Sequence, residues 1–301
     1  MSGETAVLGI GKTVRLPGGR SIGYDEYGKA DGPAVFVFHG NPGSHLDVLY
    51  AGRAALDSLP VRLIAPDRPG IGLSDPQPHR QIGDWPADVN QLADALGIGR
   101  YAVIGGSTGG PFALACARLS PQRITAAGVI SSLAPPDGPR ETKPVGTARM
   151  YFKLARRVPP LCRAQLWLMA KGLNEPVRLV REATKAMPAP DRALLAEPEA
   201  QQALLASLAE GLRTPAGLAQ DAGLAARPWG FALEEISLPM HIWHGEADGN
   251  SPVAAARYLA QAIPNSLPRI LPDEGHFSML RHLPEMVQVM TAADPQSSGT
   301  R

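Results

Sequence analysis

The chain has 301 residues, of which 44% are hydrophobic and 19% are charged. This composition supports a large buried core and excludes a disordered chain. The formal net charge is +1 and the arginines are scattered, so nucleic acid is not an expected partner. No stretch reaches the roughly 18 apolar residues that a membrane span needs, and the first residues lack a basic segment followed by an apolar run. We therefore expect a cytoplasmic protein without a membrane span.

The first half of the sequence alternates strand-like and helix-like stretches. Residues 12–16 (KTVRL) and 21–27 (SIGYDEY) flank a Pro-Gly-Gly turn and predict an opening β-hairpin. Four near-continuous apolar runs then predict strands buried on both faces. These runs cover residues 34–38, 61–66, 101–105 and 124–131. Between them, residues 84–98 have apolar side chains at helical spacing, with Asp84 as the expected N-cap and Gly97 near the end.

The second half begins with a long stretch that lacks strand signals. Residues 135–233 are rich in Leu, Ala, Arg and Glu, are interrupted by prolines, and predict several helices. Strands return at 238–244 and 267–271, with a helix at 251–263 between them and a terminal helix from about 277. The prediction is an α/β fold with a mostly parallel eight-stranded sheet, helices on both faces and an inserted all-helical segment. We divide the chain into a core (1–134 and 234–293), a helical domain (135–233) and a flexible tail (294–301).

The two cysteines, Cys116 and Cys162, allow at most one disulfide, and we expect buried free thiols. The sequence contains neither an HExxH motif nor a paired Cys-x-x-Cys motif. We predict no metal and no cofactor. The predicted partner is a small-molecule substrate, with a homodimer as a further candidate.

The motif Gly105-Gly106-Ser107-Thr108-Gly109 fits G-x-S-x-G, a turn that takes a strand sharply into a helix and exposes the serine at its tip. An apolar strand precedes the motif and a helix-like stretch, PFALACARL, follows it. Glycines on both sides of the serine let the strand and the helix approach closely. We predict that Ser107 is a nucleophile.

A serine hydroxyl needs a base within hydrogen-bond reach. His276 is the predicted base because Asp-Glu-Gly-His-Phe (273–277) lies between the last strand and the last helix, at the same sheet edge as Ser107. His39 belongs to another loop at this edge, whereas His45 and His79 are expected to be solvated. His241 and His282 fall inside a predicted strand and a predicted helix.

The base needs a carboxylate that orients its ring. Asp248 is the preferred candidate, in the loop HGEADGNSP (244–252) after a predicted strand. Glu246 in the same loop and Asp137 after an earlier strand are alternatives.

Acyl transfer also needs N–H donors for the oxyanion. The backbone of Thr108, at the start of the helix after the nucleophile, is one predicted donor. The second is the N–H of Asn41 in the loop His39-Gly40-Asn41-Pro42-Gly43.

With Ser107, Asp248 and His276 in this chain order and His-Gly-Asn-Pro-Gly at 39–43, the sequence resembles the α/β-hydrolase superfamily over nearly its whole length. Residues 67–75 (DRPGIGLSD) are similar to a loop of that superfamily that shapes the pocket floor. The resemblance implies that residues 135–233 form a cap over the active site and determine the substrate. Candidate substrate-binding residues are Gly40, Asn41, Trp167 and Phe277.

Several branches of the superfamily are similar in part. The His-Gly-Asn-Pro loop is similar to that of haloalkane dehalogenases, but those enzymes carry an Asp nucleophile where this chain has Ser107. Proline iminopeptidases typically read H-G-G-P-G and G-G-S-W-G, whereas this chain has Asn41 and Thr108 at the variable places. Apolar candidates for the cap side of the pocket are Leu161, Leu166, Trp167, Met169, Leu173, Leu204 and Leu205.

The leading functional hypothesis is hydrolysis of a small carboxylic ester or lactone through an acyl-enzyme on Ser107. A proline-iminopeptidase-like aminopeptidase, a C–C hydrolase, and a biosynthetic lyase or cyclase are alternatives on the same scaffold. An aminopeptidase would need an acidic clamp for the substrate ammonium, and Glu175, Glu182 and Glu210 are candidates for it. A small-molecule receptor that uses the pocket without turnover is the non-enzymatic alternative.

Overall fold

The computed structural model describes residues 11–292, and the tail predicted at 294–301 lies outside them. The strands form one eight-stranded sheet in the order β1-β2-β4-β3-β5-β6-β7-β8. The β1/β2 and β2/β4 pairs are antiparallel, and every pair from β4 to β8 is parallel. This confirms the predicted mostly parallel sheet. The strands are β1 Lys12–Arg15, β2 Ser21–Gly28, β3 Ala34–Phe38, β4 Arg62–Pro66, β5 Tyr101–Gly106, β6 Ile124–Ile130, β7 Met240–Gly245 and β8 Ser266–Leu271.

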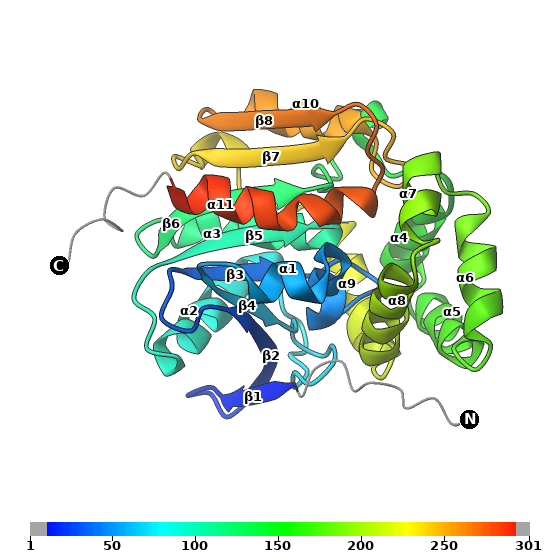
Figure 1. Cartoon of the computed structure of the whole chain (residues 1–301), viewed down its shortest axis with the longest axis horizontal. Coiled ribbons are helices and arrows are strands. Elements are labelled where there is room, and N and C mark those ends of the chain that lie inside the picture. Colours follow the sequence, from blue (N-terminus) through cyan, green and yellow to red (C-terminus); the bar gives the residue numbers. More distant parts are fainter. Residues whose placement is uncertain (1–10, 293–301) are drawn as a thin grey trace.

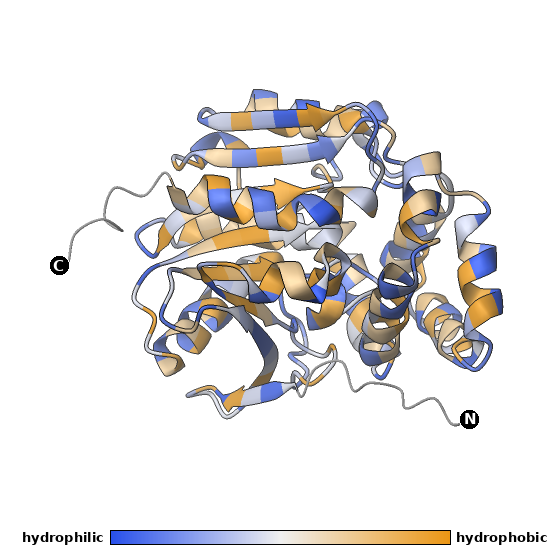
Figure 2. Ribbon diagram, in the orientation of Figure 1, coloured by the Kyte–Doolittle hydropathy of each residue, from blue (hydrophilic) through white to orange (hydrophobic). Residues whose placement is uncertain are grey.

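The central strands are apolar on both faces because helices cover both sides of the sheet. On β3, Val35 and Val37 pack into one hydrophobic cluster, and Phe36 and Phe38 pack into the other. The period of two along a strand sends neighbouring side chains to opposite faces. Figure 1 shows α1 and α11 on the near face and α2 and α3 behind it, and Figure 2 shows the apolar centre of the sheet. The covering helices are α1 Arg53–Asp57, α2 Trp85–Ala95, α3 Gly110–Leu119, α10 Val253–Ala262 and α11 Leu283–Ala292.

Six α-helices and no strand lie between β6 and residue 233, within the part of the chain that the structure describes. They are grouped beyond one end of the sheet in Figure 1. We call this stretch, residues 146–225, the helical segment. Its division from the core as a separate cap domain stays a prediction. The helices are α4 Gly146–Arg157, α5 Pro159–Gly172, α6 Pro176–Thr184, α7 Ala189–Leu194, α8 Pro198–Gly211 and α9 Pro215–Ala225.

Short 3₁₀ helices occupy several loops between these elements. They are η1 His45–Ala51, η2 Ile82–Asp84, η3 Ser107–Gly109, η4 Arg140–Thr142, η5 Leu233–Glu235 and η6 Ser278–His282.

Two local predictions need correction. Asp84 occupies the N-cap position of α2, but its carboxylate accepts the N–H of Gln81 at 2.7 Å and no bond from α2. This bond is part of the capping box of η2, the short 3₁₀ helix that precedes α2. The terminal helix expected from about 277 begins with η6, and its α-helical part starts at Leu283. Both cysteines are free and buried, as predicted. No helix among residues 11–292 is both long and apolar enough to cross a membrane.

The helical segment meets the core through a close contact between backbones. A Cβ atom at Gly217, in the first turn of α9, would lie 1.7 Å from the carbonyl oxygen of Gly70. Real Cβ atoms do not approach a carbonyl oxygen this closely, so only glycine allows α9 to lie against the 67–75 loop.

Replacing Gly217 with alanine should therefore lower the free energy of unfolding by at least about 2 kcal/mol, because the helix must move away from the loop. The measurement is the denaturation midpoint in urea and on heating. Gly172→Ala is the matched control, since its Cβ would lie 3.6 Å from the side chain of Leu179. We expect Gly172→Ala to raise the free energy of unfolding by up to about 1 kcal/mol, because alanine favours the helix over glycine. Equal stability of the two variants would contradict the assigned contact.

Candidate active site

Ser107 lies at the tip of a strained turn between β5 and α3. Its φ of +51° lies in the left-handed region, which costs a non-glycine residue about 1–2 kcal/mol. A Cβ at Gly105 would lie 2.3 Å from the carbonyl oxygen of Gly109, and a Cβ at Gly109 would lie 2.2 Å from that of Phe38. The two glycines thus permit the turn, as the sequence motif predicted, and the packed strand and helix hold it in place.

The structure brings Ser107, His276 and Asp248 together. The Ser107 Oγ lies 3.0 Å from His276 Nε2, and His276 Nδ1 lies 2.7 Å from Asp248 Oδ2. The other oxygen of Asp248 accepts the N–H groups of Asn250 and Ser251, both at 2.8 Å. Because a carboxylate only accepts hydrogen bonds, the Nδ1 atom carries the proton and Nε2 faces the serine hydroxyl as an acceptor.

The alternative acids lie elsewhere. Glu246 is exposed and pairs with Arg257 at 3.1 Å, and Asp137 is exposed on the loop after β6. Of the other histidines, His39 is buried and its Nε2 accepts the N–H of Arg68 at 3.2 Å. Glu246, Asp137 and His39 form no hydrogen bond with Ser107 or His276, whereas Asp248 binds the His276 ring.

Electrostatics favour the charged pair of Asp248 and His276. Burial disfavours ionisation of Asp248, but the His276 ring outweighs it, so the pKa of Asp248 is lowered. Burial likewise disfavours the imidazolium of His276, but the carboxylates of Asp248, Asp191 and Asp47 together raise its pKa above the ordinary value of 6.5. The site is therefore suited to hold a positive charge on His276.

A cavity of about 490 Å³ opens at Ser107 and His276, between the sheet edge and the helical segment. Three predicted substrate-binding residues, Gly40, Asn41 and Phe277, line it. Trp167 does not line it. This side chain is 54% exposed and lies against the ammonium of Lys171, 5.1 Å from the ring centre. The residues of α5 that line the cavity are instead Gln165, Leu166 and Met169.

The wall of the cavity is predominantly apolar. Of the apolar cap candidates, Leu166, Met169 and Leu204 line it, while Leu161 is 56% exposed. The apolar lining residues from the core include Val37, Val48, Tyr50, Ile104, Ile130, Leu133, Phe277, Leu280 and Leu283. Those from the helical segment and the loops between its helices include Tyr151, Phe152, Leu166, Met169, Leu179, Val180, Met187, Leu204 and Leu208.

The loop at 39–43 is held by polar groups that the sequence did not reveal. Asp47 accepts the N–H of Gly40 at 2.7 Å and the hydroxyl of Ser207 from α8. The Asn41 amide donates to the Leu218 carbonyl at 2.9 Å and accepts the hydroxyl of Tyr151. These two bonds occupy the Asn41 side chain, and the donor role expected of its backbone N–H stays a prediction. Thr108, the other predicted donor, follows Ser107 directly and is fully buried.

The 67–75 loop does not form the pocket floor, because none of its residues lines the cavity. Its Arg68 is fully buried and binds Asp221 of α9 at 2.8 Å, and Arg80 binds the same carboxylate at 2.8 Å. Arg68 also donates to the carbonyl of His39 at 2.7 Å. Arg68 therefore binds the 67–75 loop both to the 39–43 loop and to α9 of the helical segment.

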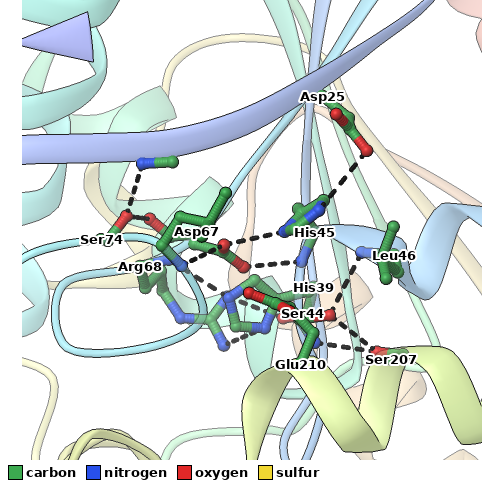
Figure 3. Close-up of polar contacts among 12 residues, drawn as sticks. Asp25, His39, Ser44, His45, Leu46, Asp67, Arg68, Ser74, Ser207 and Glu210 are labelled. Atoms are coloured by element: carbon green, nitrogen blue, oxygen red, sulfur yellow. Dashed lines mark hydrogen bonds and ion pairs between the residues drawn. The ribbon is translucent and has the colours of Figure 1, made fainter. Parts of the chain in front are cut away.

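His45 is not solvated as predicted but only 3% exposed, between two carboxylates (Figure 3). Its Nδ1 lies 2.8 Å from Asp67 Oδ2, and its Nε2 lies 3.4 Å from Asp25 Oδ2. Burial disfavours the charged ring, but the two carboxylates outweigh it and raise the pKa of His45 to about 10. No sequence signal distinguishes this histidine, because its two partners come from β2 and from the loop after β4.

Within residues 11–292, no group of three or more His, Cys, Asp or Glu side chains is arranged to hold a metal ion.

Comparisons with known proteins agree with this architecture. A family model described as alpha/beta hydrolase fold matches residues 33–166. A non-heme chloroperoxidase of Streptomyces lividans is 34% identical over 158 residues, which cover 52% of this chain and 57% of that protein. A proline iminopeptidase of Xylella fastidiosa is 35% identical over 105 residues, covering 34% of this chain and 33% of that protein. The matched region thus spans a third to just over half of these relatives.

The likeness to solved structures extends over nearly the whole chain. A thermophilic esterase from Thermogutta terrifontis superposes with a TM-score of 0.67 and 23% identity, covering 94% of this chain and 96% of that one. At this identity the comparison shows the shared fold.

The buried His45 should make the stability of the protein depend on pH. Its pKa is about 10 in the folded protein and about 6.5 in an unfolded chain, so the folded state retains a proton between these values. The resulting stabilisation is complete below pH 6.5 and is lost as pH rises through 10. We expect the free energy of unfolding to differ most between the wild type and His45→Gln near pH 6. The difference should narrow at up to about 1.4 kcal/mol per pH unit toward pH 10.

His241→Gln on β7 is the control, because burial lowers the pKa of His241 and the pH dependence from that residue has the opposite sign. If the free energies of unfolding of the wild type and His45→Gln differ by the same amount at every pH from 6 to 10, His45 is neutral in the folded protein.

Proposed function

Since the chain belongs to the α/β-hydrolase superfamily, we propose that it is a serine hydrolase that cleaves a small carboxylic ester or lactone. The observation that carries this proposal is the continuous hydrogen-bonded chain from Ser107 through His276 to Asp248, with distances of 3.0 and 2.7 Å. Ser107 and His276, at one end of this chain, line the apolar cavity.

The proposed reaction has two halves. Ser107 Oγ attacks the carbonyl carbon while His276 Nε2 takes the hydroxyl proton, and Asp248 stabilises the resulting imidazolium. The N–H groups of Thr108 and Asn41 hold the oxyanion. His276 then gives its proton to the leaving alkoxide, which leaves an acyl group on Ser107. A water molecule, deprotonated by His276, attacks this acyl group and releases the carboxylic acid with the serine restored.

The cavity supports the choice of substrate class. Its volume of about 490 Å³ suits a small molecule, and its apolar walls favour hydrocarbon groups on the acyl or alcohol side. Fifteen of the 36 lining residues come from the helical segment, so we assign that segment the role of a cap that determines the substrate. We propose Gly40, Asn41 and Phe277 as residues that contact the substrate near Ser107.

Aminopeptidase activity is the second candidate because two carboxylates, Asp47 and Glu182, line the cavity. An ammonium group of a substrate would need one of them as a partner. Asp47 already accepts two hydrogen bonds from the protein, and Glu182 pairs with Lys185. Glu175 and Glu210 pair with Arg178 and Arg213 on their own helices. Because these carboxylates already have partners in the protein, the ester hypothesis is favoured.

The first test is covalent labelling. Incubation with a fluorophosphonate should add one adduct, detected by intact mass, and Ser107→Ala should abolish both the adduct and the hydrolysis of p-nitrophenyl esters. Ser58→Ala, after α1, is the control and should label like the wild type. A panel of p-nitrophenyl esters of increasing acyl length, with aminoacyl anilides alongside, separates esterase from aminopeptidase activity. Labelling that persists in Ser107→Ala would exclude the assigned nucleophile. Folded wild type that does not label would favour a receptor.

The second test is the pH profile of kcat/KM. His276 must be neutral to accept the serine proton, and its pKa is raised, so activity should fall as pH drops through a value above 6.5. Asp248→Asn removes the carboxylate that raises this pKa most. It should lower kcat at least about 100-fold and move the acid limb to lower pH. An acid limb that is absent in the wild type would rule out a histidine base.

A further inference from the structure

Asp191 of α7 contacts the loop that carries His276, although the two residues are far apart in the chain. Its side chain is buried, with the residue 1% exposed. One carboxylate oxygen accepts the N–H of His276 at 3.0 Å. The other accepts the N–H groups of Phe277 at 2.8 Å and of Ser278 at 3.0 Å. A single side chain from the helical segment thus binds three consecutive backbone donors of the core.

The loop is built to receive this carboxylate. A Cβ at Gly275 would lie 2.4 Å from Asp191 Oδ1, so a side chain there would displace the carboxylate. The N–H of Gly275 donates to Ser278 Oγ at 2.7 Å. Four consecutive N–H groups, from Gly275 to Ser278, therefore have fixed acceptors, and Asp191 supplies three of the four bonds.

The contact bears directly on the reaction geometry. The His276 ring must meet Ser107 and Asp248 at the same time, and an error of about 1 Å in a catalytic group can cost about 100-fold in rate. Asp191 holds the backbone from which this ring projects. Its negative charge also lies close enough to His276 to favour the imidazolium.

We propose that Asp191 is a positioning residue that fixes the base loop and makes the placement of His276 depend on the seating of α7 against the core. The inference rests on the proposed function, in which His276 is the base. It gives the helical segment a role beyond forming the cavity wall: the cap must be docked for the base to be aligned.

Other titratable groups lie near His276 or its partner Asp248, and the experiment has to separate their effects from that of Asp191. Asp248 contacts the ring through Nδ1, Asp47 of η1 lines the same cavity as His276, and the buried His244 lies 3.3 Å from Asp248. Asp191 differs from all three because its hydrogen bonds go to the loop backbone.

The test compares Asp191→Asn with Glu197→Gln. Asparagine keeps the shape of the side chain but turns an NH₂ group toward N–H donors and removes the charge. Glu197 is the matched control, because it also lies in the helical segment and pairs with Arg281 of η6, but at the exposed surface. We expect Asp191→Asn to lower kcat and the fluorophosphonate labelling rate about 10- to 100-fold with little change in KM. Losses of this size are typical when a residue that orients a functional side chain is removed. Its acid limb should move to lower pH, whereas Glu197→Gln should match the wild type.

A purely structural role would lower only the thermal midpoint. Folded Asp191→Asn with the labelling rate and acid limb of the wild type would therefore overturn the proposal. Should Asp191→Asn fail to fold, Gly275→Ala provides the second variant, because it displaces the carboxylate without removing its charge. It should lower the labelling rate similarly and leave the acid limb nearer to that of the wild type, and wild-type labelling in it would also overturn the proposal.

Failure of the proposed function is distinguishable from failure of this inference. If the wild type does not label at all, the nucleophile assignment fails. The pKa of His276 by NMR and the hydrogen exchange of amides 276–278 then decide the role of Asp191. A lower pKa and faster exchange in Asp191→Asn support it, and unchanged values of both overturn it.

Discussion

The strained turn at Ser107 is the constraint on which the rest of the architecture depends. A left-handed backbone at a serine persists only where the surroundings leave no alternative. Here β5 is buried along its whole length, α3 follows within a few residues, and Gly105 and Gly109 pack where no side chain would fit. The two covered faces of the sheet therefore do more than stabilise the fold. They hold the serine hydroxyl at the sheet edge where the loops after β3, β7 and β8 converge.

Two of those loops, the ones after β3 and β8, are held in turn by buried polar groups of the helical segment. Ser207 reaches the 39–43 loop through Asp47, and Asp221 reaches it through Asn41 and Arg68. Asp191 reaches the loop that carries His276. Burying a carboxylate is unfavourable unless its oxygens are paired, and each of the three aspartates accepts two or more hydrogen bonds. A helical segment anchored in this way is part of the framework of the candidate site as well as the wall of the cavity.

Much of the fold could be predicted because its signals are local. Continuous apolar runs marked the buried strands, glycines around Ser107 marked the turn, and the loops after strands marked His276 and Asp248. Residues whose role depends on distant partners could not be found in this way. Asp47, Asp191 and Asp221 stand in no motif, and His45 was expected in solvent because nothing beside it in the sequence predicts its contacts with Asp25 and Asp67. Trp167 was misplaced because a helix face cannot be assigned until the neighbouring helices are in position.

The sequence by itself therefore determined the strand order along the chain, the sharp turn and the three residues that meet at the sheet edge. These follow from hydrophobic periodicity, from glycine sterics and from the rule that parallel strands bring their carboxyl ends to one edge. Only the tertiary structure decided which side chains form the cavity and which buried carboxylates hold its loops. Those depend on how α5, α7, α8 and α9 dock on the core, and the docking arises from packing and charge pairing between segments up to 180 residues apart.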